Sequence, residues 1–247
     1  MPSVLQFLKV ADSYERKARF FPAFIVVLPI IVFAISLRLP DDGWVKKLLV
    51  AGGAGSALVV ALAHLASAAG NRFGDAFWKK RGGLPTLRWM RVSDTAHSTQ
   101  QKQQWYDGIK KLTGLDIPAT VATKPQEEDA IISDALRQVR YQIRGKATAK
   151  MVDKHNEEYG FARNLAGLRW LMLASATLAV VGCGVAWRFE HGSVIGCVIA
   201  GCLFIYAVVM FLWLPSYVGR AGERYAESIL SIPAFSGVPK AKATKAN

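Results

Sequence analysis

The residues best suited to bind a ligand are arginines and polar side chains in the middle of the chain. Arg140, Arg144 and Arg163 carry guanidinium groups, whose forked geometry matches phosphate and carboxylate oxygens. Asn156 and Tyr159 stand shortly before Arg163, where a charged stretch leads into an apolar run. These five residues predict a pocket for an anionic ligand. The alternative is structural: the same side chains satisfy helix ends and help neighbouring helices to pack.

His64 is a second place where chemistry could occur. It lies in the interior of an apolar run, and an ionisable group inside a membrane is by default a functional candidate. Proton conduction needs further ionisable partners, so a neutral histidine bonded across helices is the alternative. The three cysteines, Cys183, Cys197 and Cys202, lack the spacing of a metal site. We therefore expect no catalytic residue, no metal and no cofactor.

The elements that must position these residues are set by four apolar runs. At a rise of about 1.5 Å per residue, each run reaches roughly 27 to 33 Å, which matches the hydrocarbon core of a bilayer. A chain of 247 residues is too short to surround four such helices with polar protein. The sequence predicts an all-α fold of four transmembrane helices, with a helical cytoplasmic domain inserted between spans 2 and 3. The predicted spans are residues 20–37, 48–69, 168–187 and 194–214.

The distribution of Lys and Arg predicts the orientation, because cytoplasmic flanks hold cations. Residues 1–19, 70–169 and 215–247 carry 27 of the 31 Lys and Arg residues, and the two short loops between spans carry the other 4. Both termini are therefore expected in the cytoplasm. The net charge of +13 follows mostly from this bias, and attraction to anionic lipids accounts for it. We expect membrane lipids as partners and no nucleic acid.

The segment between spans 2 and 3 has helical patterns. Pro125 followed by Glu127, Glu128 and Asp129 favours a helix start, because acids stabilise the positive end of the helix dipole. We expect helices over residues 99–112 and 125–144, a loop at 115–124, and a helix from residue 147 that continues into the third span. The chain divides into an N-terminal segment with spans 1 and 2 (1–69), a basic cytoplasmic domain (70–164), spans 3 and 4 (165–214) and a cytoplasmic C-terminal segment (215–247).

The helix predicted at 125–144 has two distinct faces. Its apolar residues recur at intervals of four, three and four, which forms a narrow stripe for packing against another helix. The arginines recur on a different face of the same helix. The stripe consists of Ile132, Leu136, Val139 and Ile143, and the other face carries Arg137, Arg140 and Arg144.

Small residues in the second span predict close helix contacts. Gly52 and Ser56 stand four residues apart, and Gly53 lies beside Gly52 on the same part of the helix. Such spacing lets a neighbouring helix approach closely inside a membrane, where the hydrophobic effect does not drive helices together. We expect a homo-oligomer whose contact includes these three residues.

Three short stretches share a further pattern. They are residues 80–86 (Lys-Arg-Gly-Gly-Leu-Pro-Thr), Val139-Arg140 with Arg144, and Asn156 followed by residues 159–165 (Tyr-Gly-Phe-Ala-Arg-Asn-Leu). They resemble the Gly-Gly-x-Pro-Thr, Arg-rich and Asn-x-x-Tyr-Gly-Phe-x-Arg-Asn-Leu segments of a family of bacterial four-span membrane proteins. The resemblance covers about residues 70–240. It implies the same topology, in the cell inner membrane, without an established activity.

The sequence departs from that pattern at four positions. Arg81 stands where that family usually has Trp, and Ala162 where it usually has Arg. His155 stands where the family usually has an acidic residue, and Gly145 where it often has Asp after the second Arg. The acidic residues usual at positions 145 and 155 are therefore absent, which argues against a hydrolase that depends on carboxylates.

Three functions fit this architecture. The first is a non-enzymatic membrane effector or sensor, whose cytoplasmic domain receives an anionic small molecule or a protein partner and whose oligomeric spans alter membrane integrity, for example in phage defence. The second is a membrane-bound enzyme acting on nucleotide or lipid phosphate, and the third is a channel or transport accessory subunit. Intramembrane carboxylates or a metal cluster would favour the second or third, and the sequence has neither. We therefore prefer the first.

The cation distribution leads to a topology prediction. Reporters fused after residue 247 or inserted near residue 110 should read cytoplasmic, while a reporter inserted at Asp42 should read external, because residues 1–19, 70–169 and 215–247 together hold 27 of the 31 Lys and Arg residues. Paired cytoplasmic and periplasmic reporters measure this directly. An external reading at residue 110 would overturn the four-span topology.

Overall fold

The computed structural model describes residues 13–37 and 53–235, with side chains from 13–37 and 60–233. Within these ranges the chain forms helices and no strand, only an isolated bridge between Leu37 and Gly192. The all-α prediction is therefore confirmed for these residues. The chain divides into two compact units. Unit 1 comprises residues 1–78 and 156–221, and unit 2 comprises residues 79–155 and 222–247.

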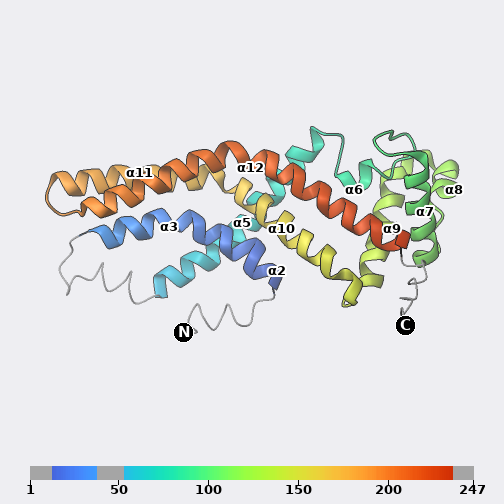
Figure 1. Ribbon diagram of the computed structural model, residues 1–247, viewed down its shortest axis with the longest axis horizontal. Helices are drawn as coiled ribbons and strands as arrows, with labels where there is room; N and C mark the ends of the chain where they lie inside the picture. Colours follow the sequence, from blue (N-terminus) through green and yellow to red (C-terminus); the bar gives the residue numbers. More distant parts are fainter. Residues whose placement is uncertain (1–12, 38–52, 236–247) are drawn as a thin grey trace, which may run out of the picture. The chain divides into compact units, whose positions relative to one another are not determined.

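Unit 1 consists mainly of long helices, several of them strongly apolar. The helix α3 follows a π-helical stretch, η1, without a break, and it packs along α11 (Figure 1). Two helices, α10 and α12, contribute residues to both units. The elements are α2 (Ser13–Glu15), η1 (Arg16–Phe20), α3 (Phe21–Ser36), α5 (Gly53–Lys79), α10 (Lys150–Gly167), α11 (Arg169–Arg188) and α12 (Val194–Phe235).

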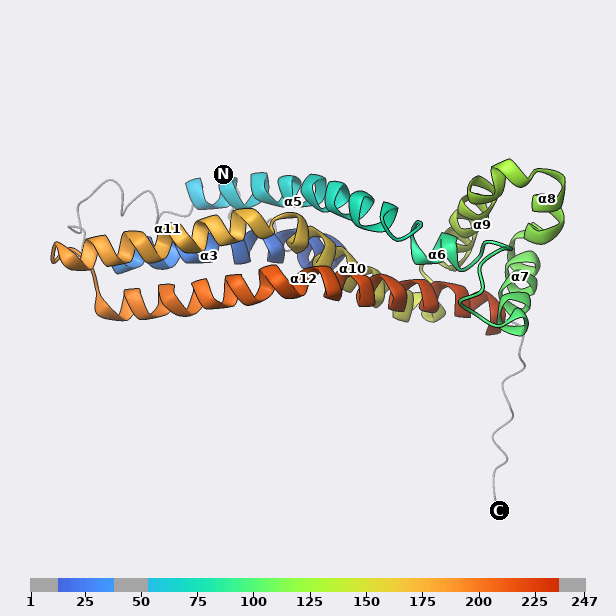
Figure 2. The same cartoon turned by 90° about the horizontal axis from the view of Figure 1, so that it is seen from above.

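Small side chains let α3, α11 and α12 approach one another. Ala179 and Cys183 of α11 form a buried cluster with Ala200 of α12, and Phe33 of α3 packs against it. A Cβ atom on Gly182 would lie 2.7 Å from the Phe33 ring, so this contact requires a glycine. Both Figure 1 and Figure 2 show α11 and α12 side by side.

Three helices in the described part of the chain are long and apolar enough to cross a membrane: Ser13–Ser36, Arg169–Arg188 and Val194–Pro233. They correspond to the predicted first, third and fourth spans. Their surfaces carry exposed large apolar side chains, among them Leu178, Ile205 and Leu212, as lipid-facing helices do. The helix α5, which contains the described part of the predicted second span, is not one of the three. Residues 48–52 of that prediction lie outside the described residues.

Unit 2 is a bundle of shorter helices around one apolar core. Figure 2 shows α7, α8 and α9 gathered together. The core contains Trp89 and Trp105, whose rings stack with centroids 6.4 Å apart. Its elements are α6 (Pro85–Arg88), α7 (Thr99–Thr113), α8 (Ile117–Thr123), η2 (Pro125–Glu127), α9 (Glu128–Ile143), η3 (Ala147–Ala149) and the adjoining parts of α10 and α12.

Local signals explain where α7 and α9 begin and end. The Ser98 hydroxyl accepts a hydrogen bond from the Gln101 backbone N–H and so caps α7, which ends at Gly114 in the left-handed conformation. The helix α9 follows Pro125 with acids in its first turn. Its predicted apolar stripe is buried in the core, and its arginines are exposed, so the two-faced pattern is confirmed. The buried stripe residues are Ile132, Leu136, Val139 and Ile143.

Two sequence expectations differ from the structure. Residues 115–124 were expected to form a loop, but 117–123 form α8, whose first turn is capped by the Asp116 carboxylate accepting from the Ala119 N–H. A helix of seven residues is too short to show periodicity. The helix expected from residue 147 into the third span is interrupted at Leu168, whose N–H bonds to both Asn164 and Leu165 carbonyls. This tightened turn separates α10 from α11.

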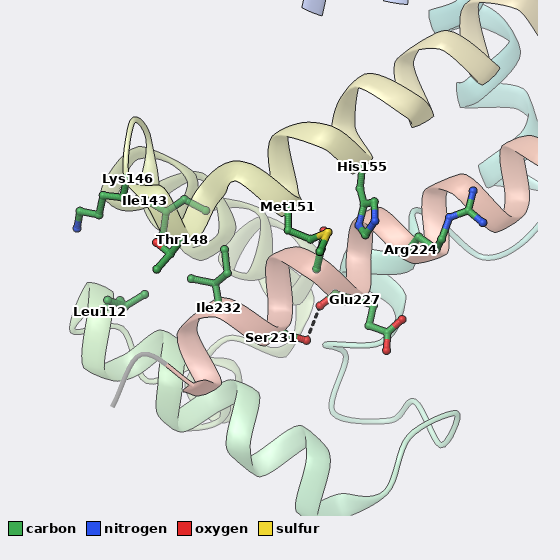
Figure 3. Close-up of a pocket in the computed structure, with 11 residues that line it drawn as sticks. Leu112, Ile143, Lys146, Thr148, Met151, His155, Arg224, Glu227, Ser231 and Ile232 are labelled. Atoms are coloured by element: carbon green, nitrogen blue, oxygen red, sulfur yellow. Dashed lines mark hydrogen bonds between the residues drawn. The ribbon is translucent and has the colours of Figure 1, made fainter. Parts of the chain in front are cut away.

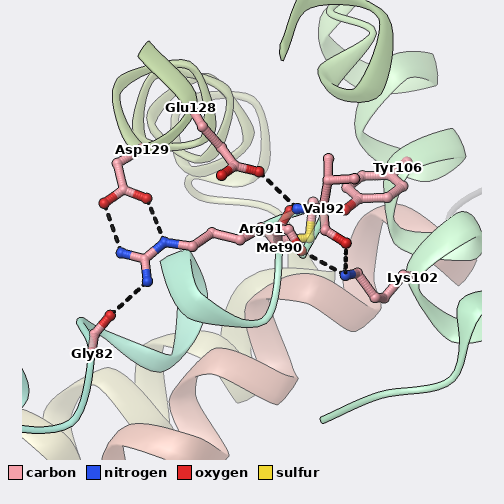
Figure 4. Close-up of polar contacts among 8 residues, drawn as sticks. All are labelled: Gly82, Met90, Arg91, Val92, Lys102, Tyr106, Glu128 and Asp129. Atoms are coloured by element: carbon pink, nitrogen blue, oxygen red, sulfur yellow. Dashed lines mark hydrogen bonds and ion pairs between the residues drawn. The ribbon is translucent and has the colours of Figure 1, made fainter. Parts of the chain in front are cut away.

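An arginine fixes the turn at the start of unit 2. Gly82 and Gly83 have φ values of 81° and 113°, which only glycine adopts readily. The Arg91 guanidinium donates to the Gly82 carbonyl at 2.8 Å and to both carboxylate oxygens of Asp129 at 2.7 Å (Figure 4). These bonds lower the pKa of Asp129. The pair therefore stabilises the fold above the pKa of an unfolded aspartate, and this stabilisation is lost as the pH falls through the lower folded pKa.

A buried lysine holds the next segment. The Lys102 ammonium donates to the backbone carbonyls of Arg91 and Val92 at 2.6 and 3.2 Å (Figure 4). It also donates to the Asp94 carbonyl at 2.7 Å. The buried Tyr106 hydroxyl donates to the Met90 carbonyl at 2.8 Å, and burial raises the pKa of Tyr106 to about 12. The Lys102 side chain thus satisfies three backbone carbonyls in a segment that has no regular secondary structure.

Replacing Lys102 by Met should lower the free energy of unfolding by about 2 kcal/mol or more, because three carbonyls lose their shared donor. Lys111→Met is the matched control, since Lys111 is exposed on the same helix and should change stability by no more than about 0.5 kcal/mol. Thermal unfolding of the detergent-solubilised full chain measures both. Equal changes in unfolding temperature for the two variants would show that the three carbonyl contacts do not contribute to stability.

Candidate functional site

A cavity of about 550 Å³ opens on the surface of unit 2. Figure 3 shows Met151 and His155 extending from α10 near Ser231 and Ile232 of α12. The hydroxyl of Ser231 donates within α12 to the Glu227 carbonyl. The cavity is lined by Leu112, Ile143, Lys146, Thr148, Met151, His155, Arg224, Glu227, Ser228, Ser231 and Ile232.

The lining combines an apolar wall with a few charged groups. Met151 and Ile232 provide apolar surface, whereas Lys146 and Arg224 lie at opposite ends of the row of lining residues in Figure 3. The Nδ1 atom of His155 is buried and has no hydrogen-bond partner in the described part of the chain. An apolar pocket with few polar groups is the usual form of a small-molecule site. The arrangement suits an amphipathic ligand with an anionic group.

The predicted arginine ligands of α9 lie outside this lining. Arg140 is exposed, and its guanidinium carbon lies 5.6 Å from the ring centroid of Tyr225. Arg144 is exposed at the end of α9, where its N–H donates to the Arg140 carbonyl. Arg163 belongs to unit 1, whereas Arg140 and Arg144 belong to unit 2. Joint ligand binding by the three remains a prediction.

Tyr159 and Arg163 are brought together in unit 1. The buried Tyr159 hydroxyl accepts a hydrogen bond from the Trp78 indole N–H at 2.8 Å, and burial raises the pKa of Tyr159. The Arg163 guanidinium carbon lies 5.6 Å from the Tyr159 ring centroid. A Cβ on Gly74 would lie 3.0 Å from the Arg163 side chain, so α5 passes close by. These contacts join α10 to α5.

Asn164 links α10 to the π-helical stretch η1. It is fully buried, and its amide donates to the Ala18 carbonyl at 2.7 Å. A Cβ on Gly70 would overlap the Asn164 side chain, and a Cβ on Gly160 would lie 2.9 Å from that of Ala18. A Cβ on Gly167 would overlap the α5 backbone. Glycines on two helices therefore allow a close three-way junction of η1, α5 and α10.

The remaining residues before the third span also make packing contacts. Glu157 forms an ion pair with Lys17 at 2.6 Å, and Glu158 accepts from the Tyr217 hydroxyl at 3.0 Å. Asn156 is half-buried one turn before Gly160 on α10. The segment thus makes contacts to η1, α5 and α12, in line with the structural alternative, although its ligand-binding role is not tested.

The other predicted residues lie on α5 or before it. His64 is exposed on α5. Gly52 lies outside the described residues, and Gly53 and Ser56 lie in the first turns of α5, where only the backbone is described. The predicted homo-oligomer contact therefore remains a prediction.

Sequence reasoning missed the cavity because its walls come from segments far apart in the chain. Leu112 and Ile143 precede Arg224 and Ile232 by some 80 residues or more, and no local spacing links them. Comparisons of the sequence with models of known families, with curated proteins and with solved structures find no match. The motif resemblance thus remains an expectation.

The glycine junction leads to a stability prediction. Gly167→Ala should lower the free energy of unfolding by about 2 kcal/mol, because the added methyl overlaps the backbone at Ala69 and Gly70. Gly184→Ala is the control, since a Cβ at Gly184 meets nothing within 4 Å and favours the helix. Thermal unfolding in detergent compares the two. A Gly167→Ala protein as stable as the control would contradict the close approach of α5 and α10.

Proposed function

We propose that the chain is a non-enzymatic bacterial membrane effector or sensor. Unit 2 is its cytoplasmic receiver of a ligand or partner signal, and the spans, as a homo-oligomer, alter membrane integrity in response. The observation that carries this proposal is α12, a helix of 42 residues that lines the unit 2 cavity near its end and contains a candidate span nearer its start. Phage defence is one setting for such a protein, suggested by analogy of architecture alone.

Four spans in the inner membrane, with both termini in the cytoplasm, are part of the proposal. The three apolar helices support it, and α5 supplies the fourth crossing through the apolar run at residues 48–69. An even number of spans places both ends on one side. The excess of Lys and Arg in the segments assigned to the cytoplasm supports this side.

The end of α12 is well suited to transmit a signal. Ala226, Ile229 and Leu230 are fully buried in the unit 2 core, so α12 cannot shift there without repacking that core. An α-helix resists bending because its backbone hydrogen bonds would break. A ligand that binds one arrangement of this core more tightly than another would therefore shift the position of a helix that also spans the membrane. α10 lines the same cavity and leads to the third span.

The receiver function can be tested by filling the cavity. Ser231→Trp should place an indole in the cavity while losing only a hydrogen bond within α12. Wild-type protein in dye-loaded vesicles should release dye when small-molecule extracts of stressed or phage-infected bacteria are added. Vesicles with Ser231→Trp should release at least about tenfold less, because the ligand is excluded. Fluorescence dequenching measures the release.

The matched control is Gln138→Trp, which adds the same side chain at an exposed position of α9 outside the cavity lining. It should respond like the wild type. Loss of response in both variants would assign the effect to the added indole rather than to the cavity. Failure of the wild type to release dye with any extract, together with normal membrane potential in overexpressing cells, would contradict the effector function.

A further inference from the structure

An arginine at the start of α11 lies between two aromatic rings from different helices. The Arg169 guanidinium carbon is 5.2 Å from the ring centroid of Phe73 on α5 and 5.0 Å from that of Phe211 on α12. Phe211 in turn makes an edge contact with Trp170, with centroids 4.5 Å apart. Cation–π contacts of this kind hold a guanidinium group in place. Arg169 is therefore positioned by three helices of unit 1.

The lengths of the two spans place this cluster at a membrane surface. α11 runs for 20 residues from Arg169 to Arg188, which is about 30 Å at 1.5 Å per residue and equals the hydrocarbon thickness. Phe211 follows Val194, the first residue of α12, by a similar length of helix. Arg169 and Arg188 thus mark the two edges of the apolar layer. The cation distribution assigns the Arg169 edge to the cytoplasm.

Two tryptophans, one beside Arg169 in sequence and one two residues after Phe211, have the exposure of interfacial side chains. Trp170 is 65% exposed and Trp213 is 43% exposed, although both are large and partly apolar. Trp213 stacks on Tyr217 with centroids 4.6 Å apart, and the Arg220 guanidinium lies 5.5 Å from the Trp213 ring. Tryptophan and tyrosine favour the level of the lipid headgroups. Arg220 thus adds a second cation, besides Arg169, to this set of residues, on the part of α12 that carries Trp213 and Tyr217.

The charge of Arg169 is not neutralised within the described chain. No carboxylate of the described residues forms an ion pair with it, and its guanidinium lies over the two rings. An arginine at the end of a span extends to the headgroup level, where lipid phosphates are the available counter-charges. Guanidinium groups bind phosphate through two parallel hydrogen bonds, and the membrane surface supplies phosphate at this depth.

We propose that Arg169, held by Phe73 and Phe211, binds the phosphate of an anionic phospholipid at the cytoplasmic edge of the membrane. Trp170 packs beside the same lipid at the level of its glycerol and upper acyl chains. The two rings restrict the guanidinium before the lipid arrives, so little conformational entropy is lost on binding. This site is separate from the unit 2 cavity, and it rests on the proposed function for the insertion and the orientation of the chain in a membrane.

Native mass spectrometry of the detergent-purified full chain tests the proposal with phosphatidylglycerol and phosphatidylcholine as probes. The wild type should retain phosphatidylglycerol with at least about tenfold higher affinity than phosphatidylcholine, as expected for charge-assisted bonds. Arg169→Gln should lose this preference. Arg188→Gln is the matched control, because it removes the same charge from the other end of the same helix, and within the described residues Arg188 makes no cation–π contact. It should keep the preference.

Three results would overturn the proposal. The first is an unchanged preference for phosphatidylglycerol in Arg169→Gln. The second is an equal loss of preference in Arg188→Gln, which would indicate only general attraction between charges. The third is displacement of the lipid by about 10 mM inorganic phosphate, which would indicate a site for a free anion. If Arg169→Gln does not fold, Arg169→Lys replaces it and should reduce the preference, because lysine keeps the charge but loses the fork. Equal binding by Arg169→Lys and wild type would then count against the proposal.

A second measurement, of membrane insertion, distinguishes failure of the lipid site from failure of the proposed function. Carbonate extraction of membranes reports insertion of each variant. A wild-type chain that is extracted as a soluble protein would contradict both proposals, because neither works outside a membrane. Normal insertion with no phosphatidylglycerol preference would overturn the lipid site alone, and dye release through the cavity would be unaffected.

Discussion

The hydrogen bond from Asn164 to the Ala18 carbonyl holds the junction from which the long helices of unit 1 extend. A fully buried amide is costly unless its polar atoms are paired, so this bond fixes one relative placement of η1 and α10. Gly70, Gly160 and Gly167 make the placement possible, because each stands where a methyl group would collide with a neighbouring element. Beyond this junction, α3 and α11 pack through apolar side chains and through a contact of the Ser36 hydroxyl with the Cys183 thiol at 3.2 Å.

Unit 2 is held together differently, because its core is formed by the burial of apolar side chains. Val139 and Ile132 of α9 meet Ile229 and Leu230 of α12, and segments more than 80 residues apart in sequence thus form one core. Between helices, where no regular hydrogen bonding is available, Lys102 and Arg91 supply the missing donors. The cavity lies on this scaffold, and two of the helices that line it, α10 and α12, also belong to unit 1.

Arginines in this chain have distinct physical roles that depend on their surroundings. Arg91 satisfies a carboxylate and a carbonyl, and its position follows from the turn at Gly82. Arg163 lies against Tyr159 within a packed junction. Arg140 is exposed on α9 near one ring. Residue type alone marks all of these as possible anion sites, whereas the contacts divide them into structural and available groups.

The sequence by itself determined the class of fold, the positions of three apolar helices and the buried stripe of α9, because hydrophobic periodicity and run length are local properties. It also placed the start of α9, through Pro125 and the acidic residues that follow it. Only the tertiary structure decided that the end of α12 completes the unit 2 core, that 117–123 form a helix, and which residues line the cavity. These depend on contacts between distant segments. No local pattern records which segments meet, because packing is decided by the shape of the whole chain.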